Sequence, residues 1–195
     1  MTRRRETISA DYFDALYRDS PDPWNFETSD YEHKKYASTL AALPRDRYDR
    51  AFEVGCSIGV LTRQLAGRCD TLIACDASAA PLQRARTNCE GLTNIIFERL
   101  TIPADWPGGS FDLIVFSEVL YYLAPADLAL CGARVAACLP VGGDVVMVHY
   151  TGETDYPLSG DDAVRLFGHS LSAFADEVRT ERSERYRLDV WRKSA

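Results

Sequence analysis

Short apolar runs alternate with longer helical patterns along the sequence, and this alternation restricts the fold more than any other feature. Strands that are apolar on both faces are typical of a parallel sheet with helices on either side. Two late runs, 178–182 and 185–191, are too close for a crossover helix, so we expect an antiparallel pair at one edge. We predict a doubly wound, mostly parallel seven-stranded α/β sheet, whose other strands are 51–54, 71–75, 94–98, 111–116 and 145–149.

The segments between the strands carry helical periodicity. Ser29, followed three residues later by Glu32, matches a capping box, in which each side chain bonds the backbone N–H of the other residue. We expect a helix from this box to Pro44, after a turn-rich loop at 20–26. The chain length fits one domain, residues 1–195. The other predicted helices are 9–19, 128–139 and 161–174, one through Leu61, Leu65 and Ala66, and one that follows Ser78 and carries Leu82, Ala85 and Cys89.

The charge balance excludes one class of function. The chain carries 22 basic and 29 acidic residues, a net charge of -7, whereas nucleic-acid-binding proteins normally present a basic face. We expect the basic run at residues 3–5 to be a solvated tail rather than a targeting signal, because no apolar segment follows it. The longest apolar stretch, 111–124, contains polar residues and is too short to cross a bilayer. We expect neither a nucleic-acid partner nor a membrane span.

The cysteines and histidines show no metal-ligand spacing. No cysteine belongs to a C-x-x-C pair, and the histidines do not repeat as zinc ligands do. Free cysteine in apolar or helical contexts behaves as a small core residue. Disulfide frameworks belong to short secreted chains, and no secretion signal is visible. We therefore expect no metal and a cytoplasmic location. The cysteines are Cys56, Cys69, Cys75, Cys89, Cys131 and Cys138.

A glycine-bearing turn, residues 53–59 (EVGCSIG), follows the first predicted strand. Gly55 permits a sharp turn, and Gly59 permits close approach by a ligand or by the next helix. The dinucleotide fingerprint G-x-G-x-x-G requires glycine where Ser57 stands and a third glycine after it. This turn therefore suits a pyrophosphate poorly. The alternative is an ordinary tight turn of a parallel α/β protein.

Asp76 ends the second predicted strand, 23 residues after Glu53. A carboxylate at this place can accept both hydroxyls of a ribose, as the acidic residue of the dinucleotide fold does. The alternative is a helix N-cap or a solvated loop acid, since Ser78 is close by. Together, the glycine turn and Asp76 indicate an adenosine-bearing ligand.

These motifs resemble those of class I S-adenosylmethionine-dependent methyltransferases over roughly residues 25–150. A narrower group of segments resembles nodulation protein S and its relatives, which N-methylate the deacetylated end sugar of chitooligosaccharides. One departure is Ser57, where class I enzymes commonly carry glycine. The segments of the narrower match are 22–26 (DPWNF), 31–36 (YEHKKY), 53–59 (EVGCSIG) and 117–123 (SEVLYYL).

The resemblance implies a cofactor site on these residues. Asp76 would hold the ribose, Thr101 and Ile102 would flank the adenine, and Gly55 and its neighbours would face the methionine part. Residues 1–44 would form a helical cap over the cofactor, to which Phe26 contributes either a cofactor contact or a core anchor. The implied cofactor-binding residues are Trp24, Tyr31, Glu53, Gly55, Cys56, Ser57, Gly59, Asp76, Ala77, Thr101, Ile102 and Ser117.

An amine acceptor must be neutral before it attacks, so a nearby proton acceptor would help. Glu118 and His149 are the candidate catalytic residues, because both stand at the ends of predicted strands. Three roles are open for Glu118: a base, a group that orients the substrate, or a ligand of the cofactor amine. The alternative for His149 is a structural role, as a hydrogen-bonded histidine at the end of a strand. The candidate substrate-binding residues are Tyr121, Tyr122 and Asp155, although Asp155 also suits a turn.

The leading hypothesis is a methyltransferase that uses S-adenosylmethionine. Direct in-line displacement needs neither a covalent nucleophile nor a metal, and the sequence has no H-E-x-x-H, G-x-S-x-G or P-loop motif. The resemblance favours an amine of an amino sugar or glycoconjugate, so the acceptor is a small molecule or an oligosaccharide. The alternatives are a nicotinamide-dependent reductase on a Rossmann-like sheet and a non-catalytic cofactor-binding scaffold.

Overall fold

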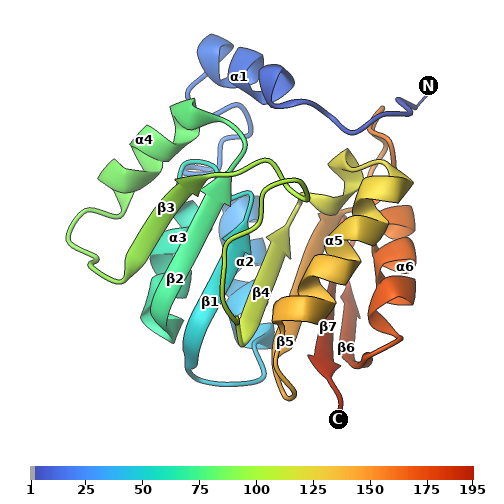
Figure 1. The fold of residues 1–195 in the computed structure, drawn as a ribbon. Helices are drawn as coiled ribbons and strands as arrows, with labels where there is room; N and C mark the ends of the chain where they lie inside the picture. The colour runs from blue at the N-terminus through green and yellow to red at the C-terminus, as the bar shows by residue number, and fades with distance from the viewer. Residues whose placement is uncertain (1–2) are drawn as a thin grey trace.

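Seven strands form one sheet in the order β3-β2-β1-β4-β5-β7-β6 (Figure 1). The computed structural model describes residues 3–195. Strands β1 to β5 are parallel, whereas β7 is antiparallel to both β5 and β6. The predicted mostly parallel sheet with an antiparallel pair at one edge is confirmed. The strands are β1 (Tyr48–Val54), β2 (Cys69–Asp76), β3 (Ile95–Arg99), β4 (Leu113–Ser117), β5 (Asp144–Tyr150), β6 (Ala175–Arg182) and β7 (Tyr186–Lys193).

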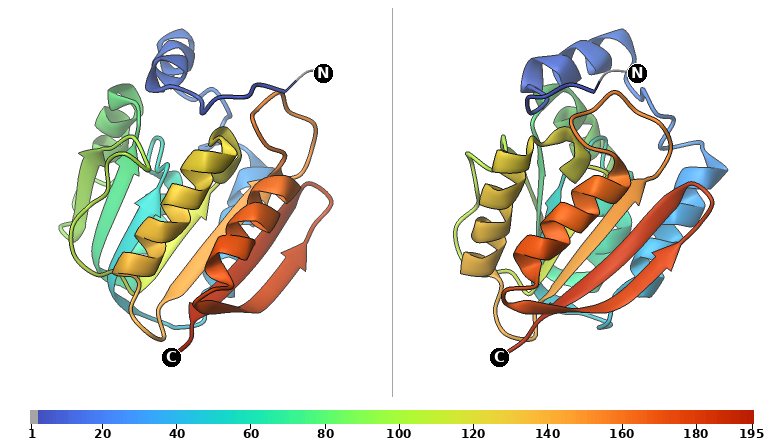
Figure 2. Two further views of the ribbon diagram at one scale, coloured as in Figure 1. Left: turned by 45° about the vertical axis from the view of Figure 1, so that its right-hand side comes forward. Right: turned by 90° about the vertical axis from the view of Figure 1, so that its right-hand side faces the viewer.

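Helices cover both faces of the sheet, as the apolar strands predict (Figure 1, Figure 2). Side chains of α2 and α3 share one buried cluster with one face of the strands. Side chains of α5 and α6 pack in a second cluster against the opposite face. The helices are α1 (Ala10–Asp19), α2 (Asp30–Ala42), α3 (Val60–Leu65), α4 (Ala79–Asn88), α5 (Pro125–Cys138) and α6 (Gly160–Leu171), with two 3-10 turns, η1 (Ala66–Arg68) and η2 (Leu120–Tyr122).

Alternate residues of the central strands supply the two clusters. In β4, Ile114 and Phe116 face α5 and α6, whereas Leu113 and Val115 face α2 and α3, and all four are fully buried. The structure contains all six cysteines in the free form, and five of them are buried. No helix among residues 3–195 is long and apolar enough to span a membrane.

The capping box at the start of α2 forms only in part. Ser29 Oγ accepts a hydrogen bond from Glu32 N at 3.4 Å, as predicted. The Glu32 carboxylate, however, lies 2.7 Å from Lys35 Nζ instead of turning back to the Ser29 backbone. Lys35 is only 1% exposed, and a buried ammonium group requires anionic partners. The need to neutralise Lys35 explains why Glu32 departs from the predicted box.

The chain order reverses between β1 and β4. The sequence runs outward from β1 to β3 in one direction, and then β4 returns to the other side of β1. In sheets of this kind, ligands bind beyond the carboxyl ends of the strands at the reversal point. Helix α1 crosses this end of the sheet (Figure 1, Figure 2).

Residues 3–9 run across the same end of the molecule, and we call this segment the strap. Arg4 N donates to Asp155 O, and Ile8 N donates to Tyr122 O, each at 2.9 Å. Arg3 Nη1 donates to Tyr156 O at 3.2 Å, and Arg4 forms an ion pair with Asp155. The expected solvation of the basic run is confirmed, but the run is not a loose tail. Its side chains are exposed, but they are attached to the loop after β5.

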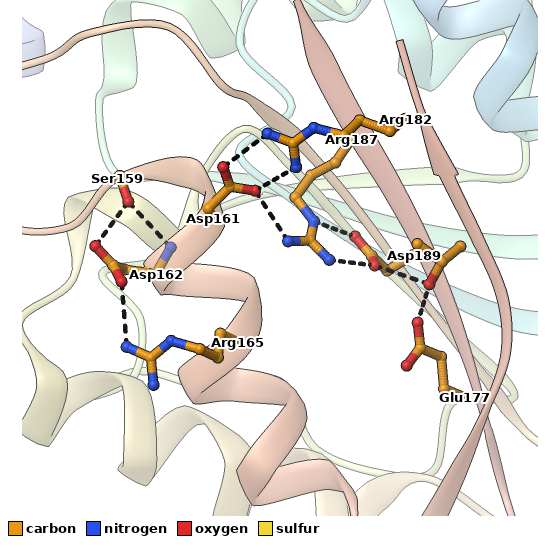
Figure 3. A network of polar contacts seen from close by, with 9 residues as sticks. Ser159, Asp161, Asp162, Arg165, Glu177, Arg182, Arg187 and Asp189 are labelled. Atoms are coloured by element: carbon orange, nitrogen blue, oxygen red, sulfur yellow. Dashed lines mark hydrogen bonds and ion pairs between the residues drawn. The ribbon is translucent and has the colours of Figure 1, made fainter.

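An ionic network attaches α6 to the β6–β7 hairpin (Figure 3). Asp161, at the start of α6, accepts hydrogen bonds from Arg182 and Arg187 at 2.7 and 3.0 Å. Arg187 also donates to Asp189, which is only 1% exposed. The two guanidinium groups lower the pKa of Asp161 to about 2. Strand β6, which forms one of the two edges of the sheet, is exposed along most of its length.

Candidate functional site

A cavity with an empty volume of about 890 Å³ lies at the carboxyl ends of the central strands, and Phe13 and Tyr17 of α1 are among its lining residues. Its walls come from the strap, from α1, from the loop after α1, and from the ends of β1, β2 and β4. The cavity therefore coincides with the point where the chain order reverses between β1 and β4. It is lined by eleven of the candidate residues: Trp24, Gly55, Ser57, Asp76, Ala77, Thr101, Ile102, Ser117, Glu118, Tyr121 and Tyr122.

The glycine turn presents little free backbone to this cavity. Gly55 N and Cys56 N both donate to Cys75 O at 2.8 Å, so these amides face β2. Gly55 has φ +79°, and a Cβ there would lie 2.3 Å from Val119 Cγ2. At Gly59, with φ +82°, a Cβ would meet the Ala85 backbone at 3.0 Å. Gly59 thus permits close packing of α3 on α4. The amides are not arranged to cradle a pyrophosphate.

Asp76 is held at the cavity wall by backbone amides. Ser57 N donates to its Oδ2 at 3.0 Å, and Ser78 N donates to its Oδ1 at 2.9 Å. Burial raises the pKa of Asp76 to about 6, although these two hydrogen bonds favour the charged form. The N-cap of α4 is Ser78 rather than Asp76. Asp76 therefore presents a fixed, buried carboxyl group to the cavity.

Glu118 is held by side chains. Its Oε1 forms an ion pair with Lys35 Nζ, and its Oε2 accepts a hydrogen bond from Tyr121 OH at 2.8 Å. Its backbone lies at φ +61°, a conformation that is uncommon outside glycine and often found at functional sites. We call Glu32, Lys35 and Glu118 the ion triad. Burial raises the pKa of Glu32.

The large cavity has an acidic lining. Its lining carboxyl groups belong to Glu32, Asp76 and Glu118, and no lysine or arginine of the described chain is among its lining residues. Lys35 reaches instead a smaller adjoining cavity of about 350 Å³, which Glu53 and Cys56 also line. Burial raises the pKa of Glu53 to about 7. A lining of carboxyl groups attracts cations, such as an ammonium or a sulfonium group.

Aromatic rings form much of the remaining wall. Trp24 packs between Tyr17 and Phe26, with ring centroids 5.8 and 5.4 Å away. On the strap side, Phe13 packs edge-on against Tyr122. Phe26 lines both cavities and also packs against the core, so the structure confirms the core anchor, and the cofactor contact stays a prediction.

His149 does not reach the cavity. It is fully buried, and its Nε2 accepts a hydrogen bond from Leu120 N at 3.0 Å. Burial lowers the pKa of His149 to about 3. A neutral, enclosed imidazole that already accepts a backbone hydrogen bond cannot take a proton from an acceptor. The prediction of a catalytic role is thus corrected in favour of the strand-end alternative, in which His149 fixes the start of η2.

Three other candidates also lie outside the lining residues of both cavities: Gly59, Tyr31 and Asp155. Gly59 instead allows α3 to pack closely on α4. Asp155 is half-buried and pairs with Arg4 of the strap, so it supports the strap rather than a ligand. Tyr31 packs beneath Arg185, whose guanidinium carbon lies 4.3 Å from the ring centroid. Tyr31 therefore contributes to the surroundings of Lys35 and not to the cavity wall.

Sequence reasoning missed Lys35 and Tyr17 as site residues. Lys35 follows Lys34 in the YEHKKY segment, and only the second of the two is buried. Tyr17 is 8% exposed and shares a hydrogen bond with Ser57 Oγ. The available signal was the helical spacing of Lys35 from Glu32, but spacing alone does not say which lysine faces inward.

Comparisons with known proteins agree with this architecture. The family model of nodulation protein S matches residues 10–138. Nodulation protein S of Bradyrhizobium diazoefficiens is 37% identical over 103 residues, which are 52% of this chain and 49% of that protein. The Rhizobium tropici protein is 31% identical over 127 residues, 64% of this chain and 53% of that protein. The chain thus spans about half the length of the curated relatives it matches.

Solved structures share the same fold. A crystal structure from Pseudomonas syringae, described as a candidate methyltransferase, is 36% identical with a TM-score of 0.72 and covers 84% of this chain and 99% of that chain. N-methyltransferase NodS from Bradyrhizobium japonicum WM9, in complex with S-adenosyl-L-homocysteine, is 23% identical with a TM-score of 0.78. This match covers 93% of this chain and 97% of that chain. At that identity, the likeness establishes the fold alone.

Proposed function

This chain belongs to the nodulation protein S family and has the class I methyltransferase fold, and from that premise we propose that it transfers a methyl group from S-adenosylmethionine to an amine. The acceptor is an amine of an amino sugar or glycoconjugate, small enough to enter the cavity or presenting its end to it. We propose a cytoplasmic location, because the six cysteines are free.

The arrangement of Asp76 carries this proposal. Its carboxyl group is buried at the end of β2, where two backbone amides hold it. It lines the cavity next to the glycine turn. A carboxylate fixed in this way can accept both hydroxyls of a ribose. Thr101 and Ile102 line the cavity on the side of β3 and would flank the adenine. The chemistry of these residues fits an adenosine-bearing cofactor.

The methionine end of the cofactor fits the region between β1 and β4. Gly55 and Ser117 line both cavities there, and Glu53 and Cys56 line the smaller one. Of the cap predicted at 1–44, residues 1 and 2 lie outside the described residues; residues 3–44 would act as a cap, since Tyr17, Trp24 and the strap form one wall of the cavity. The bound cofactor supplies an electrophilic methyl group on a sulfonium centre. Aromatic faces and carboxylates attract such a cation.

The acidic lining favours an amine as the acceptor. Glu118 stands at the end of β4, where its carboxylate can hold an amine nitrogen or accept its proton. Tyr121 OH and Lys35 fix the orientation of that carboxylate. The protein thereby excludes water and aligns the amine with the methyl group, and alignment alone can supply roughly 7–11 kcal/mol of a barrier.

The other two hypotheses make different predictions. A nicotinamide-dependent reductase needs free amides for a pyrophosphate, whereas Gly55 N and Cys56 N are bonded to Cys75 O. A non-catalytic scaffold would bind the cofactor without turnover. The acidic lining and the ordered carboxylate of Glu118 favour catalysis over a scaffold.

Calorimetry with S-adenosylhomocysteine tests the cofactor. We expect micromolar binding by the parent and at least about a hundredfold weaker binding by Asp76→Ala, because a hydrogen bond to a charged group contributes about 1.5–3 kcal/mol and Asp76 would accept two. Asp70→Ala is the matched control, since Asp70 is an exposed residue of the same strand. No binding at millimolar concentration, or equal binding by the parent and Asp76→Ala, would contradict the proposal. NADH titration should show no binding.

The acceptor is found by transfer from labelled S-adenosylmethionine to a panel of amino sugars, glycolipid precursors and small amines. We expect label on nitrogen, and none on matched compounds whose amine is replaced by a hydroxyl. Transfer to the hydroxyl compounds alone would overturn the amine assignment. Binding without transfer to any compound would favour the scaffold.

A further inference from the structure

Helix α1 contacts the two residues whose backbone amides hold Asp76. Ser57 N and Ser78 N donate to the two carboxylate oxygens of Asp76. The hydroxyl of Ser57 shares a hydrogen bond with Tyr17 OH, and the hydroxyl of Ser78 donates to Asp14 Oδ1. Each serine thus joins Asp76 through its backbone and α1 through its side chain.

The two contacts on α1 come from one face of the helix. Asp14 and Tyr17 are three residues apart, so their side chains are neighbours on the helix surface. Tyr17 is 8% exposed and Ser78 is fully buried, and Tyr17 itself lines the large cavity. Burial raises the pKa of Tyr17, so its hydroxyl stays neutral. The Tyr17 contact is therefore buried, whereas the Asp14 contact is only partly buried, since the Asp14 side chain is 31% exposed.

Ser57 adopts a backbone conformation that a side chain makes costly. Its φ is +49°, in the left-handed region that favours glycine. Glycine would relieve this strain but would remove the hydroxyl that Tyr17 contacts. The presence of serine at this angle therefore points to a use for the hydroxyl itself.

Resting on the proposed function, we propose that Asp14 and Tyr17 are positioning residues that fix Asp76 for the ribose through Ser57 and Ser78. Neither side chain needs to touch the ribose hydroxyls. When α1 is in place, the two serines are held at both ends, and the Asp76 carboxylate keeps the orientation that two hydroxyls require. Cofactor binding and the docking of α1 then stabilise each other, since the coupling between two events is reciprocal.

Substitution of Ser57 distinguishes a role in positioning Asp76 from a role in the stability of the fold. Ser57→Gly removes the hydroxyl and relieves the positive φ, so we expect an unchanged or higher melting temperature together with about three- to tenfold weaker binding of S-adenosylhomocysteine. Tyr17→Phe should weaken binding by a similar factor. The double variant should bind no more weakly than either single variant, because both remove the same hydrogen bond.

Two controls complete the test. Tyr12→Phe removes a hydroxyl from α1 at a position that does not line either cavity, and we expect unchanged binding. The 2′,3′-dideoxy form of S-adenosylhomocysteine lacks the hydroxyls that Asp76 would accept. The parent should bind it more weakly, and Ser57→Gly and Tyr17→Phe should cause no additional loss.

The outcomes distinguish this inference from the function on which it rests. If the parent fails to bind S-adenosylhomocysteine, the proposed function and the inference fall together. If the parent binds, and both variants bind equally well, the inference alone is overturned. It is also overturned if the variants lose equal affinity for the dideoxy ligand, since α1 would then act through general packing.

Discussion

Two carboxyl groups stand at strand ends of the same cavity, and they are held in opposite ways. Asp76 is fixed by the backbone amides of Ser57 and Ser78, both of which lie next to strand ends. Glu118 is fixed by the side chains of Lys35 and Tyr121, and Lys35 is 83 residues away in the sequence. The first arrangement is a product of the sheet, whereas the second depends on individual side chains.

Because of this difference, we expect substitutions around Asp76 and substitutions around Glu118 to have different effects. Backbone amides persist when side chains change, so the orientation of Asp76 should tolerate nearby substitutions that leave the contacts of α1 with Ser57 and Ser78 in place. The orientation of Glu118 should respond to substitution of Lys35 or Tyr121. We therefore assign cofactor affinity mainly to Asp76 and acceptor turnover mainly to Glu118.

The largest effect is expected from Lys35→Met. This substitution leaves Glu118 and Glu32 without their cation in a buried site, and loss of one partner of a buried ion pair typically costs about 3–5 kcal/mol. Urea unfolding should show that loss in the free energy of unfolding. Lys34→Met removes the neighbouring exposed lysine and should change stability by less than about 0.5 kcal/mol. Equal, small effects at both positions would show that the triad does not stabilise the acceptor side.

The next effect is expected from Glu118→Gln. Glutamine keeps the size of the side chain and can still accept from Tyr121, but it removes the negative charge. With the acceptor that the panel identifies, kcat should fall by about ten- to a hundredfold, since a positioned charge or proton acceptor contributes at least this much. The Kd for S-adenosylhomocysteine should change by less than about threefold. A large loss of affinity with unchanged kcat would reverse the assignment of the two carboxyl groups.

The smallest effect concerns pH. Because burial raises the pKa of Asp76 to about 6, its carboxylate is mostly protonated at pH 5 and ionised at pH 8. An ionised carboxylate is the better acceptor of ribose hydroxyls, so affinity for S-adenosylhomocysteine should rise by up to about tenfold over this range. The stability of the unliganded protein should depend on pH in the opposite direction. The protonated form is favoured in the folded state, so this group's contribution to stability falls as pH rises through about 6.

Asp76→Asn controls for other groups that titrate in the same range. Glu53 has its pKa raised to about 7 by burial, and it lines the adjoining cavity. If Asp76 carries the effect, the variant should bind weakly and with little dependence on pH. If the affinity of Asp76→Asn keeps the full pH dependence, the titrating group is not Asp76, and Glu53 is the next candidate.

The sequence predicts the Asp76 side of the site better than the Glu118 side. Asp76 could be placed because β1 and β2 are parallel neighbours, so their carboxyl ends meet by necessity. The ion triad could not be placed, because Lys34 and Lys35 are equivalent in the sequence pattern. Packing of α2 against the sheet decides which of them is buried.

The error at His149 has a related cause. A residue at the end of a predicted strand was expected to face the ligand, but β5 lies between β4 and β7, one strand beyond the reversal point. Its side chains are covered on both faces, and the cavity opens nearer to β1 and β4. Strand ends identify the correct edge of the sheet, and strand order decides which of these ends a ligand can reach.

Strand β6 has a consequence for self-association. Its unpaired side is bordered by exposed charges of both signs, including Asp176, Glu177 and Arg179, and a bulge interrupts its pairing with β7 between Glu177 and Arg179. Charges and bulges of this kind prevent an open sheet margin from templating a strand of another molecule. Crowded copies of this protein should therefore resist fibril-like growth along that margin.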